Sequence, residues 1–140
     1  MRKKILIIDD DVNLATIMRQ FLVDKGFDVE TAFDAYAGVA AAGDFRPDLI
    51  LLDLQMPAGG GAAVCVRISQ NMAINKTPII FITSASQKEL KEQLPIVSQA
   101  KGHFKKPVDT NALMAAIDRV LGADSGGSTP PPNKPDISGS

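Results

Sequence analysis

The segment Lys4-Ile5-Leu6-Ile7-Ile8-Asp9-Asp10-Asp11 places four consecutive aliphatic residues directly before three aspartates. A short apolar run of this kind predicts a strand that is buried on both faces of a sheet. Apolar residues at helical spacing over 12–25 predict a helix directly after it, and Gly26 stands where helix C-caps favour glycine. This end of the chain therefore predicts a β–α unit with acidic residues at the carboxyl end of its strand.

The same alternation continues through the chain, where further apolar segments are each followed by a segment with helical periodicity. The expected strands are 4–8, 27–32, 48–53, 78–83 and 102–105, and the expected helices are 12–25, 35–42, 62–71, 88–100 and 111–121. Strands that alternate with helices are typical of a parallel sheet with right-handed crossovers.

The polarity of these strands indicates their order in the sheet. The first, third and fourth are apolar throughout, whereas the second is more polar and the fifth is short, which suits the two edges. We therefore predict an α/β fold with a doubly wound five-stranded parallel sheet of order 2-1-3-4-5, a flavodoxin-like (βα)5 arrangement. The functional site is then expected at the carboxyl ends of strands one and three.

Length and composition fit one domain of this kind. The chain has 140 residues, 45% of them apolar, and its fifteen Lys and Arg nearly balance sixteen Asp and Glu. This balance gives no electrostatic footprint for nucleic acid or an anionic membrane, and no apolar run is long enough to span a bilayer. The single cysteine, Cys65, excludes an internal disulfide and is interpreted as a core residue. We expect a cytoplasmic domain.

The residues 124–140 are rich in Ser, Pro and Gly, and Ile137 is their only large apolar side chain. Such a segment cannot bury enough surface to offset the entropy of ordering it. We therefore expect a folded domain at 1–123 and a flexible tail or linker at 124–140. The chain would then be either a stand-alone protein or a domain cut from a larger one at its linker.

Four of the predicted strands end in polar residues that would meet at one edge of the sheet. These are Asp9-Asp10-Asp11, Asp53, Thr83-Ser84 and Lys105-Lys106-Pro107, after the first, third, fourth and fifth strands. Neighbouring carboxylates repel one another, and a hard divalent cation such as Mg²⁺ relieves the repulsion. A cation-loaded carboxylate cluster with a nearby lysine favours a phosphoryl ligand. Asp53, at the centre of the edge, is the candidate nucleophile.

Simpler roles exist for some of these residues. Asp10 or Asp11 is a candidate N-cap of the first helix, and Thr83 is equally compatible with an ordinary strand residue. The run Gly59-Gly60-Gly61 lacks the Lys-Ser/Thr that follows a P-loop, and we interpret it as a flexible loop at a helix entry.

Four motifs taken together resemble the receiver domains of two-component response regulators, the CheY-like family. They are Ile-Leu-Ile-Ile-Asp-Asp-Asp at 5–11, Leu-Ile-Leu-Leu-Asp-Leu-Gln-Met-Pro at 49–57, Ile-Ile-Phe-Ile-Thr-Ser-Ala at 79–85 and Phe-Lys-Lys-Pro at 104–107. The resemblance covers the chain from Lys3 to about Leu121. It implies a phosphoprotein that accepts a phosphoryl group on Asp53 from a sensor histidine kinase or phosphotransfer protein and switches a partner-binding face. Such a domain is a phosphoacceptor that promotes its own Mg²⁺-dependent phosphorylation and dephosphorylation, not an enzyme with a separate substrate.

The resemblance also implies a set of metal ligands. Asp9 and Asp10 match the acidic pair that holds Mg²⁺, with Asp10 the more direct ligand. Asp53 and the backbone carbonyl of Gln55 would complete the protein ligands.

Other positions match the residues that respond to phosphorylation in this family. Thr83 matches the switch hydroxyl, Lys106 the lysine that pairs with the phosphoryl group, and Pro107 the usual cis proline. His103 stands at a switch position that is usually Tyr or Phe, which puts a standard aromatic swing in doubt. Gly60-Gly61 stands where Asp-Gly is usual, and we expect it to loosen the entry to the third helix.

Two other functions fit parts of this pattern. A Mg²⁺-dependent phosphatase with an aspartyl-phosphate intermediate needs a second Asp two residues after the nucleophile, where this chain has Gln55. A degenerate receiver that only docks partners has no need of the complete set of site residues.

The entry to the fifth strand, 100–104, lacks the acidic residues that DNA-binding regulators use for dimer salt bridges. We therefore expect a monomer or weak dimer, an unknown downstream target or output domain, and no direct contact with nucleic acid or membrane.

Overall fold

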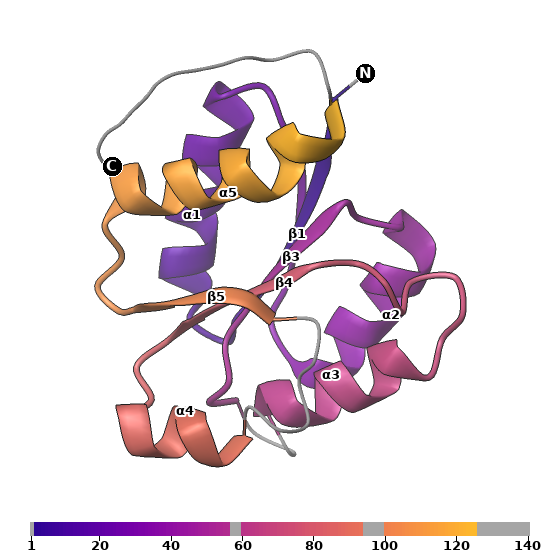
Figure 1. Cartoon of the computed structure of the whole chain (residues 1–140), viewed down its shortest axis with the longest axis vertical. Helices are drawn as coiled ribbons and strands as arrows, with labels where there is room; N and C mark the ends of the chain where they lie inside the picture. Colours follow the sequence, from indigo (N-terminus) through magenta and orange to yellow (C-terminus); the bar gives the residue numbers. More distant parts are fainter. Residues whose placement is uncertain (1, 57–59, 94–99, 126–140) are drawn as a thin grey trace. The chain divides into compact units, whose positions relative to one another are not determined.

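The computed structural model describes residues 2–56, 60–93 and 100–125 (Figure 1). The chain divides into two compact units, Met1–Val108 and Asp109–Ser140. The elements are β1 (Lys4–Ile8), α1 (Val12–Asp24), β2 (Asp28–Ala32), α2 (Ala35–Phe45), β3 (Leu49–Leu52), α3 (Gly60–Ser69), β4 (Ile79–Thr83), α4 (Gln87–Gln93), β5 (Ala100–Lys105) and α5 (Thr110–Ser125). The alternation predicted from the sequence is confirmed in the described residues, with α5 in the second unit.

The strands form one parallel five-stranded sheet in the order β2-β1-β3-β4-β5, as predicted. The two strands that the sequence assigned to the edges, β2 and β5, are the edge strands. Figure 1 shows α1 on one side of the sheet and α2 and α3 on the other. Because β1 and β3 are neighbours whose following helices lie on opposite faces, the switch point of the fold lies between them.

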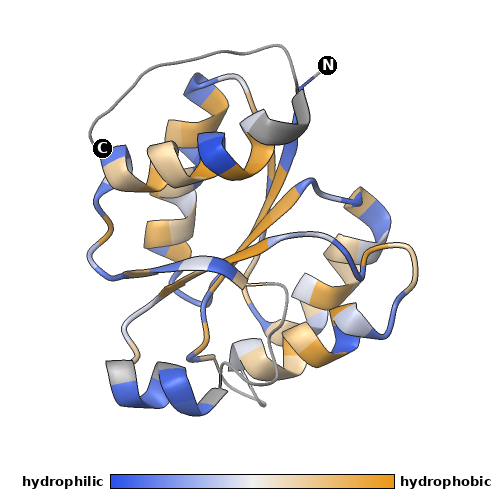
Figure 2. Ribbon diagram, in the orientation of Figure 1, coloured by the Kyte–Doolittle hydropathy of each residue, from blue (hydrophilic) through white to orange (hydrophobic). Residues whose placement is uncertain are grey.

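The core explains why the central strands have continuous apolar sequences. Every residue of β3 and β4 is buried, and Figure 2 shows the central strands as hydrophobic along their length. Alternate residues of β1, β3 and β4 face α2 and α3, where they pack in one cluster with Ala42, Val64, Cys65 and Ile68. Gly38 lets α2 approach β1 closely, since a Cβ there would lie 2.7 Å from Cγ2 of Ile8.

The position of Cys65 in this core gives a first prediction. The thiol is buried, and burial raises its pKa to about 12. At about pH 8 the reactive thiolate is therefore scarce, and we expect the native protein to react with a disulfide reagent at least about a hundredfold more slowly than the denatured chain. Absorbance of the released thiol measures both rates. Equal rates would contradict the burial of this side chain.

Several element boundaries differ from those predicted. The helices α2 and α5 extend beyond the expected ends because Gly43 and Gly122 lie inside them, where a glycine costs only about 1 kcal/mol and does not by itself end a helix. Ala100 was assigned to the preceding helix but pairs with Ile79 in β5, because pairing with a neighbouring strand outweighs the helix propensity of alanine.

Two predictions concern residues outside the described ranges. The expected helix 88–100 contains Pro95, which predicts a kink or a break in it, and this residue lies within 94–99. Most of the expected tail lies within 126–140, so both stay predictions. Among the described residues, no helix has the length and the apolar character needed to cross a membrane.

Candidate functional site

The loops after β1 and β3 bring acidic residues to the carboxyl edge of the sheet. The backbone N–H of Asp9 donates to the carbonyl of Ala32, and that of Asp53 donates to the carbonyl of Ile8, so both residues continue the pairing of the strands. Asp11 is the N-cap of α1, because its carboxylate accepts a hydrogen bond from the Leu14 N–H. The capping role thus falls to Asp11, and Asp10 has no need to serve it.

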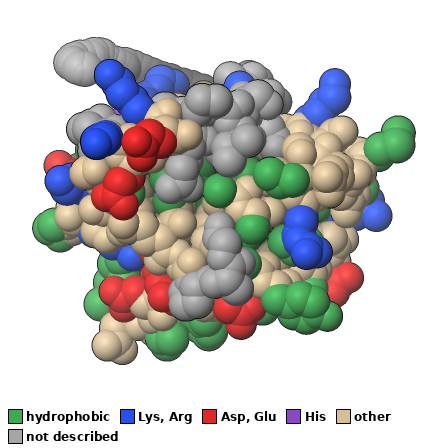
Figure 3. Space-filling view, turned by 90° about the horizontal axis from the view of Figure 1, so that it is seen from below, with side chains coloured by type: hydrophobic (Ala, Val, Ile, Leu, Met, Phe, Trp, Pro, Cys, Tyr) green, Lys and Arg blue, Asp and Glu red, His purple; other side chains and the backbone are tan. Residues whose placement is uncertain are grey.

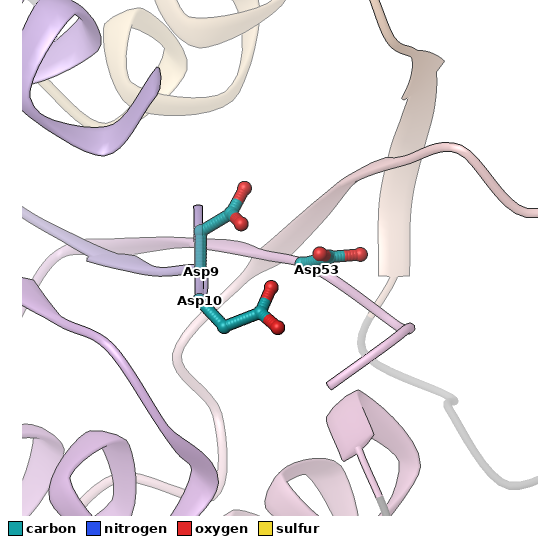
Figure 4. A group of neighbouring side chains, drawn as sticks. All are labelled: Asp9, Asp10 and Asp53. Carbon is teal, nitrogen blue, oxygen red and sulfur yellow. The ribbon is translucent and has the colours of Figure 1, made fainter. Parts of the chain in front are cut away.

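Asp9, Asp10 and Asp53, hereafter the acidic cluster, meet at this edge. Each offers a carboxylate oxygen within 4.8 Å of the others, and Figure 4 shows the three side chains as neighbours at this edge. Asp9 and Asp53 are buried, with 1% and 3% of their surface exposed, whereas Asp10 is exposed. Three carboxylates this close repel one another unless cations balance them.

Lys106 provides one balancing charge from the end of β5. Its Nζ lies 2.9 Å from Oδ2 and 3.1 Å from Oδ1 of Asp9, and 3.3 Å from Oδ2 of Asp53. Burial acts to lower the pKa of the Lys106 ammonium, but the two carboxylates outweigh it and the pKa is raised. Lys106 is therefore a cation held between two buried anions. The peptide bond that follows it, to Pro107, is cis.

One lysine does not satisfy the whole cluster. Burial raises the pKa of Asp9, and the charge of Asp53 adds to this, while hydrogen bonds from the Asp11 N–H and Lys106 oppose it. Oδ2 of Asp9 is buried and accepts no hydrogen bond from the described residues, although it lies close to the Lys106 charge. The acidic cluster thus retains carboxylate oxygens with unused capacity, in an oxygen-rich site of the kind that suits a hard divalent cation.

Two of the candidate residues are not joined to this cluster. Thr83 is buried at the end of β4, and its Oγ1 accepts a hydrogen bond from the Ala85 N–H at 3.2 Å. His103 is exposed on β5, opposite Phe81 in the register with β4. Among the described residues, no hydrogen bond or ion pair connects either side chain to the acidic cluster.

Gln55 lies between the acidic cluster and the loop that follows β4. Its backbone N–H donates to Oδ1 of Asp53 at 2.9 Å. Its side-chain Oε1 accepts from the Ser84 hydroxyl at 2.7 Å, and its Nε2 donates to Oε2 of Glu89 at 3.2 Å. These side-chain bonds are not among the contacts predicted from the sequence. A readable signal was the spacing Ser86-x-x-Glu89, which is typical of a helix capping box.

Gly60 and Gly61, which were expected to loosen the entry to the third helix, are the first residues of α3 and are tightly packed. Both are buried, and the Gly61 N–H donates to the Leu54 carbonyl at 3.0 Å. A Cβ at Gly61 would lie 2.5 Å from the Asp53 carbonyl oxygen, and one at Gly60, whose φ is +62°, would collide with the Leu54 carbonyl. Glycine is needed here because α3 begins directly against the backbone that carries Asp53.

This close approach predicts that Gly61→Ala lowers the free energy of unfolding by about 1–3 kcal/mol, since backbone has to shift to admit the methyl group. Urea denaturation measures the change. Gly43→Ala is the matched control, because a Cβ there meets nothing within 4 Å, and it is expected to stabilise by about 0.4–1 kcal/mol. Equal stability of the Gly61→Ala and wild-type proteins would contradict the tight contact.

The fold and the site together define a flavodoxin-like α/β protein with an acidic site at the carboxyl ends of β1 and β3. The family model for the response regulator receiver domain matches residues 5–118, and the chain belongs to this family. It is the receiver domain of a two-component response regulator, and receiver domains are signalling modules that interact with histidine kinases or phosphotransfer proteins.

Individual relatives agree with this assignment. The chain is 34% identical over 118 residues to the DNA-binding dual master transcriptional regulator RpaA of Synechocystis, covering 84% of this chain and 48% of that protein. It is 32% identical over 117 residues to the DNA-binding response regulator MtrA of Mycolicibacterium paratuberculosis, covering 84% and 50%. The chain therefore spans about half the length of the curated relatives it matches.

A solved structure agrees in fold over a whole chain. The chemotaxis protein CheY4 of Vibrio cholerae superposes with a TM-score of 0.79 at 30% identity, covering 86% of this chain and 100% of CheY4. A receiver domain alone is thus enough to account for the match.

Proposed function

We propose that Asp53 accepts the phosphoryl group in this receiver, and that the donor is a phosphohistidine on a sensor histidine kinase or phosphotransfer protein. The observation that carries the proposal is the position of the Asp53 carboxylate. It is buried at the switch point of the sheet, 3.3 Å from the Lys106 ammonium and within 4.8 Å of two further carboxylates.

The proposed transfer needs a nucleophile and groups that hold it in place. A carboxylate oxygen of Asp53 forms the new O–P bond as the N–P bond of the phosphohistidine breaks. The bonding electron pair stays on the ring nitrogen of the histidine, and this nitrogen can then bind a proton from solvent. The Gln55 N–H orients the Asp53 carboxylate through Oδ1, and Lys106 lies close enough to neutralise part of the charge on the transferred group.

We further propose that the site takes Mg²⁺ on Asp9, Asp10, Asp53 and the backbone carbonyl of Gln55. The donor set fits, because the acidic cluster offers hard oxygen ligands, and Oδ2 of Asp9 accepts no hydrogen bond from the described residues although the Lys106 ammonium lies 2.9 Å away. When bound, the ion supplies charge neutralisation for the phosphoryl oxygens. With it, the domain would promote its own phosphorylation and the later hydrolysis of its acyl phosphate.

Phosphorylation is proposed to act through Thr83, whose hydroxyl would leave the Ala85 N–H and turn to the phosphoryl group beside Lys106. The exposed His103 would respond on β5, and a partner-binding face would shift between two pre-existing states. We propose a cytoplasmic monomer or weak dimer whose downstream partner or output domain is another protein or protein segment, with the folded domain at 1–123 and a tail at 124–140.

A mass measurement tests the proposal. Incubation with acetyl phosphate and Mg²⁺ should add the mass of one phosphoryl group to the wild-type chain, and chelation of Mg²⁺ should prevent it. A receiver that only docks partners would show neither a gain in mass nor a Mg²⁺-dependent spectral change. The complete set of Asp10, Asp53, Thr83 and Lys106 favours phosphoryl acceptance over this alternative, and Gln55 disfavours a phosphatase.

A further inference from the structure

The side chain of Gln55 joins two segments that lie far apart in the sequence. It follows β3, whereas its partners Ser84 and Glu89 follow β4, and both ends of its amide are used, as acceptor from Ser84 and donor to Glu89. The same residue holds the Asp53 carboxylate through its backbone N–H. These three side chains, the Gln55 bridge, therefore connect the acidic cluster to the start of α4.

The start of α4 is itself organised by hydrogen bonds. Ser86 and Glu89 form a reciprocal capping box, in which the Glu89 N–H donates to Oγ of Ser86 and the Ser86 N–H donates to Oε1 of Glu89. The charged side chains of α4 are exposed, and Figure 3 shows acidic and basic side chains gathered at the left, the side where α4 lies in Figure 1. These hydrogen bonds, together with the bond from Gln55 to Glu89, hold the first turn of α4.

The loop after β4 is held by two hydrogen bonds, one of which belongs to the Gln55 bridge. The Thr83 hydroxyl oxygen accepts a hydrogen bond from the Ala85 N–H, within its own loop. Ser84, between these two residues, is tied to Gln55 at 2.7 Å. A turn of the Thr83 side chain away from Ala85 breaks the first of these bonds, and a movement of the loop that carries Thr83 and Ser84 together would also break the second.

We propose that the Gln55 side chain is a positioning group that holds the resting arrangement of the β4–α4 loop and is released when Asp53 is occupied. The inference rests on the proposed function, since it takes Asp53 as the acceptor. A bond present in only one of two states shifts their equilibrium by its own free energy. Removing the bond therefore favours the state in which Thr83 has turned.

The variant Ser84→Ala tests this, because it removes the hydroxyl that Gln55 accepts from and leaves the acidic cluster and Lys106 unchanged. With beryllofluoride and Mg²⁺ as the probe, we expect half-saturation at about two- to tenfold lower beryllofluoride than in the wild type, the range for loss of one net hydrogen bond. Amide chemical shifts measured by NMR give the titration.

A second readout separates a population shift from simple damage. Without beryllofluoride, the amide signals of Ala85 and Glu89 in Ser84→Ala should move along the straight line that joins the unbound and saturated wild-type positions. Shifts away from that line indicate a local distortion and would overturn the proposal. The same substitution made in a Gln55→Leu background should have no further effect, because its partner amide is already absent.

Ser86→Ala is the matched control. It removes the N-cap hydroxyl of α4 and leaves all three side chains of the Gln55 bridge in place. It should leave the half-saturation point unchanged, and an equal gain in this variant would assign the effect to fraying of α4 and overturn the proposal. Wild-type half-saturation in Ser84→Ala would overturn it as well. Failure of the wild-type chain to bind beryllofluoride would instead overturn the proposed function on which it rests.

Discussion

Asp53→Asn is expected to take up no phosphoryl group from acetyl phosphate and Mg²⁺, whereas the wild-type chain gains one. An amide nitrogen or carbonyl oxygen is a far poorer nucleophile than a carboxylate, and the change also removes one negative charge from the acidic cluster. The fold should be retained, because Asn keeps the size of Asp and an oxygen that can accept from the Gln55 N–H. Intact-mass spectrometry measures the gain.

Asp11→Asn provides the control for this experiment. Asp11 is an aspartate in the same loop as Asp9 and Asp10, but its side chain caps α1, and Asn is an equally good N-cap. This variant should gain the phosphoryl group as the wild type does. Uptake by Asp53→Asn at the wild-type level would place the acceptor elsewhere and refute the proposed function.

The sequence predicts the fold well because the burial of a strand or helix requires a regular pattern of apolar residues. A strand covered on both faces has to be apolar at every position, so 49–52 and 79–83 are recognisable without any knowledge of their neighbours. The meeting of Asp9, Asp10, Asp53 and Lys106 follows from the same pattern, since the carboxyl ends of parallel strands share one edge. The order of the strands was enough to bring these four residues together.

Features that depend on single side-chain contacts were not predictable in this way. The direction of the Thr83 hydroxyl is set by one hydrogen bond to a residue in its own loop, and the bond from Gln55 to Glu89 joins residues that share no periodic pattern. Gly60-Gly61 has the composition of a flexible loop, yet packing requires glycine at both positions because there is no room for a Cβ beside the backbone of Asp53 and Leu54. Composition alone does not distinguish these two uses of glycine.

Lys106→Ala is expected to lower the free energy of unfolding in Mg²⁺-free buffer by about 3 kcal/mol, because it leaves buried carboxylates without their ammonium partner. The two carboxylates that Lys106 contacts are almost fully buried, since the side chains of Asp9 and Asp53 are only 2% and 4% exposed. Mg²⁺ should restore much of this stability, since its proposed ligands are all retained. Urea denaturation with and without Mg²⁺ measures both effects.

The same variant should separate binding from response at the site. Magnesium affinity should be nearly unchanged or higher, because the ammonium that competes for the Asp9 and Asp53 oxygens is gone, while the NMR shifts of the β4–α4 loop on adding beryllofluoride should disappear. Lys105→Ala removes the exposed neighbouring lysine and should change stability by no more than about 0.5 kcal/mol. A loss of metal affinity in Lys106→Ala would contradict the assignment, because it would mean that the lysine helps to build the metal site rather than to balance its charge.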